Sequence, residues 1–600
     1  MMQDTDRFAV DLPWGATLRP DGRGTRFRLW APSVAELWLE AEGLAPLPMQ
    51  PEGEGWFAVE APCGAGTQYR FRLAPDLAVP DPASRRQAGD VHDPSVVVDP
   101  RSYAWRHAAW RGRPWHEAVV YELHAGLLGG FAGVARELPR LQELGVTAVE
   151  LMPIADFPGP RNWGYDGVLP YAPDAAYGTP DELKALIDAA HGLGLMVFLD
   201  VVYNHFGPDG AYLHVLAKPF FDPARPTPWG PAIDMRRPEV AGFFEANALY
   251  WLNEYRFDGL RFDAVHAIAE RSWLRRLAAR IRAEIEPGRH VHLILENEAN
   301  TAGLLRAAPA DPGFDAQWND DGHNALHVIL TGEREGYYAR YAEDAARKLA
   351  TVLAEGFWRQ GQTEGGEALH GEKCGHLPPT AFLVFLQNHD QIGNRAFGER
   401  LAALADPDAL RAATALLLLG PQIPLLFMGE EWAAASPFLF FTSFPDPDLA
   451  KAVREGRRRE FARFSAFADP RRRAEIPDPN AEETFLRSRP DPAEAAQAPH
   501  AETLALYRRL LALRHAEIVP RLPGARAIAA QALSDAAVLA RWRLGDGTVL
   551  AIACNLGGEP AAARCRGRVL FESVPHAAAA LAGGTLPRAA AVVLLEDEAG

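Results

Sequence analysis

The sequence has few cysteines, and they do not occur in the patterns that usually build structure or hold metal. Its 600 residues include only Cys63, Cys374, Cys554 and Cys565, and no two of them form a C-x-x-C pair. This argues against a disulfide-built secreted scaffold and against a zinc site made of cysteines. We predict four free thiols in a reducing compartment.

Long apolar runs are also missing. No stretch reaches the roughly 18 apolar residues that a membrane span requires. Residues 1–10 carry Asp4, Asp6 and Arg7 where a secretion signal would have its apolar core. We therefore expect a soluble protein of the cytoplasm.

Positive charge is the third scarcity. Lysine and arginine number 61 against 78 aspartate and glutamate residues, which gives a formal net charge of −17. Nucleic acids and anionic membranes are polyanions, so neither is an expected partner. No phosphate-binding G-x-x-x-x-G-K-[ST] loop is present either. A neutral or cationic ligand suits this balance better.

The chain is long enough for several domains, and its pattern changes twice. Residues 1–112 contain short alternating segments such as Arg26–Trp30, which predict a β-sandwich. Residues 113–518 alternate apolar runs with amphipathic stretches, and residues 519–600 return to a small β domain. Within the middle part, residues 206–240 are rich in proline, and we expect an irregular, lid-like excursion there.

Eight apolar runs in the middle part predict the strands of a closed (β/α)8 barrel, giving an α/β fold of the TIM-barrel type. They are Val119–His124, Ala148–Ile154, Met196–Asn204, Gly259–Val265, His292–Glu298, Asp315–Asp320, Phe382–Asp390 and Ile423–Glu431.

Carboxylates stand at the ends of four of these runs. Asp200, Asp263, Glu296 and Asp390 belong to four different predicted strands. Barrel enzymes carry their chemistry at the C-terminal ends of the strands, so these acids are expected to meet on one rim. Gathering like charges costs stability unless a function requires it. The pattern therefore indicates acid/base chemistry without a metal or cofactor.

Two carboxylates that flank a glycosidic bond are what glycoside hydrolysis requires. Arg261 lies two residues before Asp263 and shares its face of the strand, so its cation is expected to keep Asp263 ionised. Burial and the charge of Asp263 should raise the pKa of Glu296 and let it act as an acid. Glu298 shares that face by the two-residue period and is the rival acid.

The four motifs, in this order and spacing, resemble those of the α-amylase family of glycoside hydrolases. The resemblance implies a retaining double displacement with Asp263 as nucleophile, Glu296 as general acid/base and Asp390 as the carboxylate that stabilises the transition state. It also implies a sugar site around the cleavage point, for which the candidate residues are Tyr165, His205, Arg261, His266, His389, Gln391 and Asn394. Asn204 resembles a calcium ligand of amylases, but no companion ligands are evident.

Further segments resemble one subgroup, the malto-oligosyltrehalose trehalohydrolases. These segments are Ala155–Gly159, Thr227–Ile233, Gln317–Asn324 and Gln387–Leu401. The resemblance implies hydrolysis of the α-1,4 bond next to a terminal trehalose unit, and the N-terminal sandwich resembles the module before the barrel in branching and debranching enzymes. The candidates for binding the trehalose unit are Asp320, Asp321, His323 and Asn324, with Trp229 as a stacking wall.

Two other functions remain open from the sequence. A glucan branching enzyme, an α-glucan transferase of the same family, has the same module and carboxylates and differs in its acceptor. A glucan-binding protein without activity is disfavoured, because binding alone does not need an acid of raised pKa. The sequence does not predict the oligomeric state.

Overall fold

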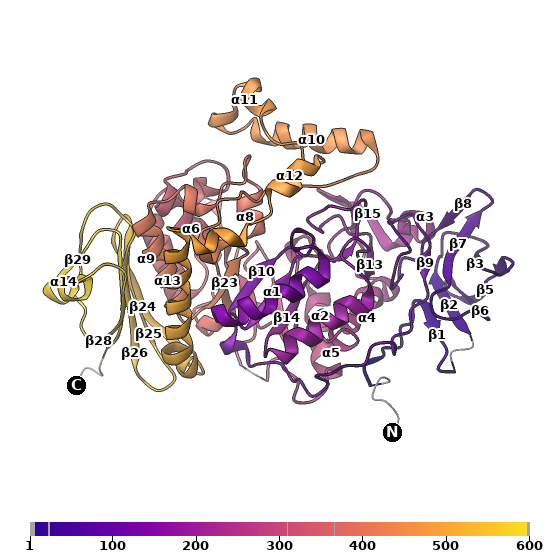
Figure 1. Ribbon diagram of the computed structural model, residues 1–600, viewed down its shortest axis with the longest axis horizontal. Helices are drawn as coiled ribbons and strands as arrows, with labels where there is room; N and C mark the ends of the chain where they lie inside the picture. Colours follow the sequence, from indigo (N-terminus) through magenta and orange to yellow (C-terminus); the bar gives the residue numbers. More distant parts are fainter. Residues whose placement is uncertain (1–6, 22–23, 309, 365–366, 597–600) are drawn as a thin grey trace.

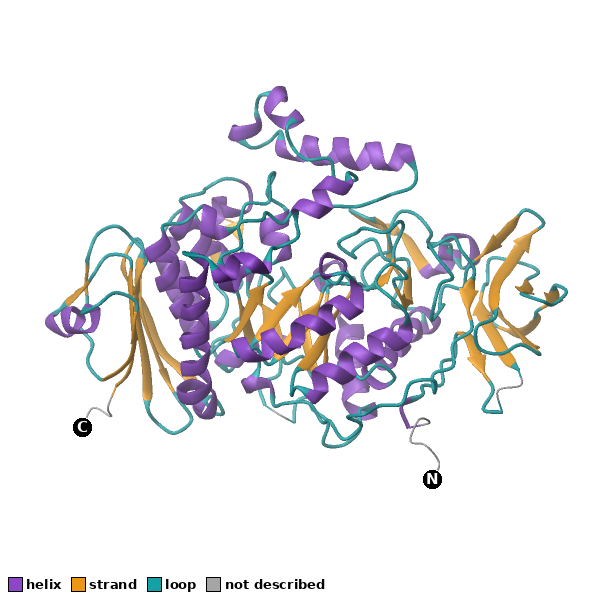
Figure 2. Cartoon of the chain, in the orientation of Figure 1, coloured by secondary structure: helices purple, strands orange, loops and turns teal. Residues whose placement is uncertain are grey.

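The computed structural model describes residues 7–21, 24–308, 310–364 and 367–596. A β-rich region lies at each end of its long axis, and the barrel with its surrounding helices lies between them (Figures 1 and 2). The outermost residues of the first and last predicted domains, 1–6 and 597–600, lie outside the described residues. No helix in the described ranges is both long and apolar enough to span a membrane.

The N-terminal region forms two facing antiparallel sheets. Phe27 and Leu29 are buried in one sheet, whereas Arg26 is exposed and Arg28 is half-buried, as the alternating pattern predicts. Across the interface, the Phe27 ring lies 4.8 Å from that of Tyr69 in the other sheet. The sheets consist of β1 (Gly15–Leu18), β2 (Thr25–Trp30), β6 (Trp56–Ala61) and β5 (Gln50–Gly53), and of β4 (Leu47–Pro48), β3 (Trp38–Ala41), β7 (Gln68–Ala74) and β8 (Leu77–Val79), with β9 (Ser95–Val96) paired to β7. The predicted sandwich is confirmed.

The middle region is a closed barrel of eight parallel strands, in sequence order around the ring. The strands are β10 (Val120–Leu123), β11 (Ala148–Leu151), β14 (Met196–Val201), β17 (Gly259–Phe262), β18 (His292–Leu295), β19 (Ala316–Trp318), β22 (Phe382–Val384) and β23 (Ile423–Phe427). All eight predicted strands are confirmed, and each ends earlier than the apolar run that predicted it. The acids at the ends of the runs thus fall at or just beyond the strand ends.

Large helices surround the barrel. They include α1 (Gly130–Leu144), α2 (Pro180–Gly192), α4 (Pro238–Asn253), α5 (Arg271–Glu284), α6 (Asp320–Thr331), α7 (Ala345–Glu355), α9 (Pro407–Leu419) and α13 (His500–Leu513). Inside the barrel, side chains such as Val120, Phe198, Ile294 and Leu425 form a separate apolar cluster. This packed cluster fills the lower part of the barrel, and the acids expected from the sequence lie toward the C-terminal ends of the strands.

The excursion after the third barrel strand is more regular than the sequence predicts. It contains a single helical turn, α3 (Leu213–Leu216), and a hairpin of β15 (Phe221–Thr227) and β16 (Gly230–Ile233). Proline is tolerated here because a two-stranded ribbon has two free edges, where the missing N–H breaks no ladder. The hairpin turn carries Trp229, which is 48% exposed.

A helical arm, which the sequence patterns above do not predict, projects beside the barrel. It comprises α10 (Pro447–Phe461), α11 (Pro470–Ala474) and α12 (Glu482–Arg487) and stands out at the top of Figure 1. The first two helices begin with Asp-Pro, where the side chains of Asp446 and Asp469 accept hydrogen bonds from the first turn. An aspartate cap followed by proline at the first helical position is a signal for the start of a helix.

The C-terminal region is a five-stranded antiparallel sheet that packs on α7 and α9. Its order is β24 (Arg526–Ser534), β25 (Ala537–Arg543), β26 (Val549–Asn555), β30 (Ala590–Glu596) and β28 (Arg568–Glu572). The fully buried Trp542 donates a hydrogen bond from Nε1 to the Leu353 carbonyl of α7 at 3.0 Å. The four cysteines are buried and unpaired, as predicted.

Trp542 should therefore couple this sheet to the barrel. We expect Trp542→Ala to lower the free energy of unfolding by about 3 to 5 kcal/mol, because it leaves a cavity at the interface. Denaturant unfolding followed by circular dichroism measures this loss. Ile528→Ala, on the exposed side of the same sheet, is the matched control and should change stability by less than about 0.5 kcal/mol. Equal effects of both variants would contradict the interface role.

Candidate active site

Arg261 on β17 lies at the centre of the strand-end acids. Its side chain is 1% exposed, and its guanidinium packs over the Trp318 ring at 4.2 Å. The Nη1 group lies 2.5 Å from an oxygen of Asp200 and 2.9 Å from one of Asp263, while Nη2 lies 2.8 Å from Glu296. One cation thus joins carboxylates that come from three neighbouring strands, β14, β17 and β18.

Asp263 directly follows β17 and is almost completely buried. Besides Arg261, Asn204 donates a hydrogen bond from Nδ2 to its Oδ2 atom at 2.8 Å. Burial raises the pKa of Asp263, and Arg261, Asn204 and a hydrogen bond from Glu296 lower it. The charge of Asp200 raises it as well, and the net shift is upward, so Arg261 opposes the effect of burial without cancelling it.

Glu296 follows β18 and faces Asp263. Its Oε2 atom accepts hydrogen bonds from Arg261 and from the Ala264 amide, both at 2.8 Å. Burial raises the pKa of Glu296, Arg261 lowers it, and the charge of Asp263 raises it again. Burial and Asp263 act in the expected direction, and the net shift of the pKa of Glu296 is upward.

Asp390 lies in the first turn of α8 (His389–Gly393). The residue before it, His389, is held by Glu122. The Nδ1 group of His389 and its backbone amide both donate to the Glu122 carboxylate on β10. Its Nε2 group lies 2.9 Å from the Tyr165 hydroxyl, which donates to Asp200 at 2.6 Å. Burial lowers the pKa of His389, whereas Glu122 and Asp390 raise it, and the net shift is upward.

Aromatic rings close two sides of this centre. The Tyr165 ring stacks on His389 with 5.1 Å between centroids. On the other side, Trp229 of the excursion stacks on His205 at 4.6 Å and 11°. His205 is held by hydrogen bonds to the Asn204 side chain and to the Tyr165 carbonyl. The structure thus brings these four predicted residues around the carboxylates.

The rival acid lies outside this cluster. Glu298 has an exposed side chain, and its oxygen lies 3.5 Å from Arg359. β18 ends at Leu295, so the two-residue period no longer applies at Glu298. His266 is also exposed, and its Nδ1 atom accepts a hydrogen bond from the Glu298 amide at 3.3 Å.

The four residues predicted to bind the trehalose unit lie at the start of α6 and point in different directions. Asp320 is half-buried, and burial together with Glu296 and Asp390 raises its pKa well above the usual range. Asp320 therefore belongs to the carboxylate centre. Asn324, one turn later on the same face, is also half-buried.

Asp321 does not fit the expectation. It is buried, and its two oxygens accept five hydrogen bonds, from Asn300, from Tyr341, from the Trp358 amide, and from the amide and side chain of Arg359. One residue along a helix turns the side chain by about 100°, which directs Asp321 away from the rim occupied by Asp320. It anchors the 357–359 loop.

His323 is likewise buried. It lies 2.8 Å from the Leu386 carbonyl through Nδ1 and stacks on Phe385. Burial lowers the pKa of His323 to about 3, so it is neutral. Asp321 and His323 thus bind backbone groups behind the site and do not face it.

The remaining candidates follow Asp390 on α8. Asn394 donates from Nδ2 to the Asp390 Oδ1 atom at 2.6 Å. Gln391 is half-buried, and its backbone amide donates a hydrogen bond to the side chain of Asn388, which caps α8.

Sequence reasoning missed the contributions of Glu122 and Asn204. Glu122 was visible as a charged residue inside an apolar run, which is a signal for a buried functional acid. Asn204 was considered only as a possible calcium ligand, whereas its amide contacts Asp263 and His205. Among the described residues, no group of three or more His, Cys, Asp or Glu side chains is arranged to hold a metal ion.

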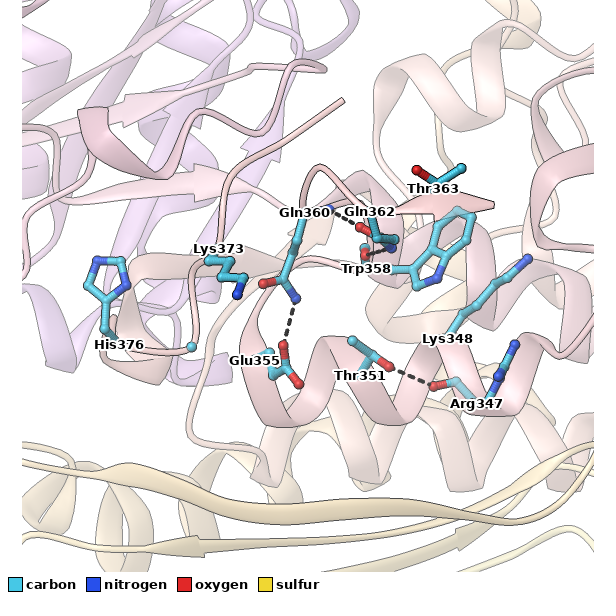
Figure 3. A pocket seen from close by; sticks show the side chains of 11 residues that line it. Arg347, Lys348, Thr351, Glu355, Trp358, Gln360, Gln362, Thr363, Lys373 and His376 are labelled. Atoms are coloured by element: carbon cyan, nitrogen blue, oxygen red, sulfur yellow. Dashed lines mark hydrogen bonds between the residues drawn. The ribbon is translucent and has the colours of Figure 1, made fainter. Parts of the chain in front are cut away.

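A separate groove of about 760 Å³ lies along α7, and Figure 3 shows the side chains that line it. They include Lys348, Trp358, Gln360 and Lys373, and Glu355 is the one acid among the lining residues that the structure describes. None of these described lining residues belongs to the carboxylate centre of the barrel rim. Trp358 precedes Arg359, so the groove and the site share the loop that Asp321 anchors.

Comparison with known proteins agrees with this geometry. The model of the alpha amylase catalytic domain matches residues 97–219, and that of a domain of unknown function, DUF3459, matches residues 525–593. The malto-oligosyltrehalose trehalohydrolase of Deinococcus radiodurans is 42% identical over 515 residues, covering 84% of this chain and 83% of its own. The chain belongs to this trehalohydrolase family.

Two further relatives bear on fold and alternatives. A crystal structure from Salmonella typhimurium, provisionally named alpha amylase, superposes with a TM-score of 0.91 at 44% identity and covers 97% of this chain and 99% of its own. A 1,4-alpha-glucan branching enzyme of Streptomyces avermitilis is 38% identical, but over only 40% of this chain and 45% of its own. The likeness to branching enzymes is thus partial.

The contact between Glu122 and His389 predicts a pH effect. Glu122→Gln removes the carboxylate that raises the pKa of His389 and leaves burial, which lowers it. The imidazolium should then be lost at lower pH, and the alkaline limb of kcat/KM should move to lower pH. Rate profiles against pH measure this, with Glu60→Gln on the exposed sandwich surface as a control of equal charge change. An unmoved alkaline limb in Glu122→Gln would show that the charge of His389 is not needed.

Proposed function

We propose that the protein hydrolyses the α-1,4-glucosidic bond next to the terminal trehalose of malto-oligosyltrehalose, releasing trehalose and a shorter maltooligosaccharide. The observation that carries this is the pairing of Asp263 and Glu296 around Arg261 in a chain whose near full-length relatives are trehalohydrolases. The enzyme is a glycoside hydrolase of the α-amylase type.

The two carboxylates have the environments that a double displacement needs. Asp263 attacks the anomeric carbon and forms a glycosyl ester, while Glu296 gives its proton to the departing O4 atom of trehalose. Glu296, now ionised, then removes a proton from water, which attacks the same carbon and releases Asp263. Arg261 keeps both carboxylates in place and stabilises whichever of the two is ionised at each step.

The surrounding side chains hold the reacting sugar. Asp390 accepts hydrogen bonds from the sugar hydroxyls and stabilises the positive charge of the transition state, and His389, on the same short helix, holds the Tyr165 hydroxyl in place. Tyr165 offers its ring face, and the stacked His205 and Trp229 form the opposite wall. A protonated Asp320 can donate as well as accept, so it and Asn324 suit the hydroxyls of trehalose.

The identity of the acid can be tested with substrates that need no proton on the leaving group. Glu296→Gln should retain far more of the wild-type rate on an activated aryl glucoside than on the natural bond. Glu298→Gln, at the exposed neighbouring acid, should behave like wild type on both. Steady-state kinetics on the two substrates measure the ratio. The reverse pattern would make Glu298 the acid.

The substrate itself is tested by product analysis. The enzyme should cleave malto-oligosyltrehalose faster than maltooligosaccharide of equal length, release free trehalose and form no α-1,6 branches. Asp320→Ala should lower kcat/KM for the trehalose-ended substrate by about ten- to a hundred-fold, since a hydrogen bond involving a buried acid is lost, and should affect maltooligosaccharide less. Chromatography of the products decides. Equal rates on both substrates would indicate a general amylase, and new branches a transferase.

A further inference from the structure

One buried arginine of the helical arm, Arg457, binds the segment that follows Asp390. Arg457 of α10 is 9% exposed, and it and Phe461 are the buried residues of this helix. Its Nη2 group donates to the carbonyls of Gly393 at 2.6 Å and Arg395 at 3.1 Å. The Phe461 ring lies against its guanidinium at 4.8 Å. The arm is therefore tied to the segment that continues from α8.

The same guanidinium reaches the Asp390 side chain through one amide. The Nη1 group donates to the Asn394 Oδ1 atom at 3.3 Å, and the Asn394 Nδ2 group donates to the Asp390 Oδ1 atom at 2.6 Å. An asparagine amide has one acceptor end and one donor end. Because Arg457 occupies the acceptor end, the donor end must face the carboxylate. If the amide were flipped, its oxygen would face the Asp390 carboxylate and its NH2 group would face the Arg457 guanidinium, so neither contact could be a hydrogen bond.

We propose that Arg457 is a positioning residue for Asp390, which makes the arm part of the catalytic machinery without any contact to the substrate. The inference rests on the proposed function of Asp390. It also revises the expectation for Asn394, whose amide is occupied at both ends by protein groups and acts as a link in this relay.

The arm also contacts the 388–400 segment through apolar side chains, in addition to the hydrogen bonds of Arg457 and Asn394. Phe461 and Ile476 of the arm pack with Ala396 in a small apolar cluster. On its far side, the 388–400 segment is held by Arg395, whose two terminal nitrogens lie 2.7 and 2.8 Å from Glu333. Replacing Arg457 should therefore leave the arm folded while it releases the Asn394 amide.

The first test compares two arginines of the same helix. Arg457→Met should lower kcat by about ten- to a hundred-fold with little change in KM, because a misplaced carboxylate weakens the transition state more than binding. Arg459→Met, which removes an equal charge from an exposed position, should keep the wild-type kcat. Arg457→Lys should recover part of the rate. Thermal unfolding of each variant verifies that the fold persists. Equal losses in Arg457→Met and Arg459→Met would overturn the proposal.

The second test is a double-mutant cycle. A relay predicts that Asn394→Ala loses as much kcat as Arg457→Met and that the double variant loses little more, whereas independent structural roles would add. If Arg457→Met does not fold, Asn394→Ala alone decides, and an unchanged kcat would refute the relay. Rates are measured on whichever α-1,4 bond the wild type cleaves. An active Asp390→Asn variant would instead refute the role proposed for Asp390 itself.

Discussion

The buried guanidinium of Arg261 is the interaction on which the active centre depends. It has carboxylates from β14, β17 and β18 within hydrogen-bonding distance and rests on the Trp318 ring. Burying several acids together without a cation would be strongly unfavourable, because desolvation and mutual repulsion act in the same direction. Arg261 makes the cluster tolerable while leaving upward pKa shifts on Asp263 and Glu296.

The network around Arg261 follows the closure of the barrel. Asp200, Tyr165, His389 and Glu122 form a continuous chain of hydrogen bonds that runs from β14 back to β10 across the barrel mouth. In it an anion, a hydroxyl, a cation and another anion alternate, so each group has a complementary neighbour. Because β10 and β14 are separated only by β11 in the ring, barrel geometry sets the span of this chain.

Elements outside the barrel complete the site from two sides. The hairpin of the excursion brings Trp229 onto His205, and the arm brings Arg457 to the Asn394 amide. The strand-end acids are common to enzymes of this type, whereas such inserted segments are where related barrels differ in the substrate they select. Of the two segments, only the hairpin places a ring, Trp229, at the sugar site, so it is the one whose variation is expected to change substrate choice.

The sequence by itself determined the eight strands, the central carboxylates and the common face of Arg261 and Asp263, because strand periodicity is local and strand ends converge by barrel geometry. Tertiary structure decided what depends on where an element stops or on distant partners. β18 ends before Glu298 and leaves it exposed, and α6 begins at Asp320, which turns Asp321 inward. The contact between Arg457 and Asn394 joins residues 63 positions apart, and no local pattern encodes it.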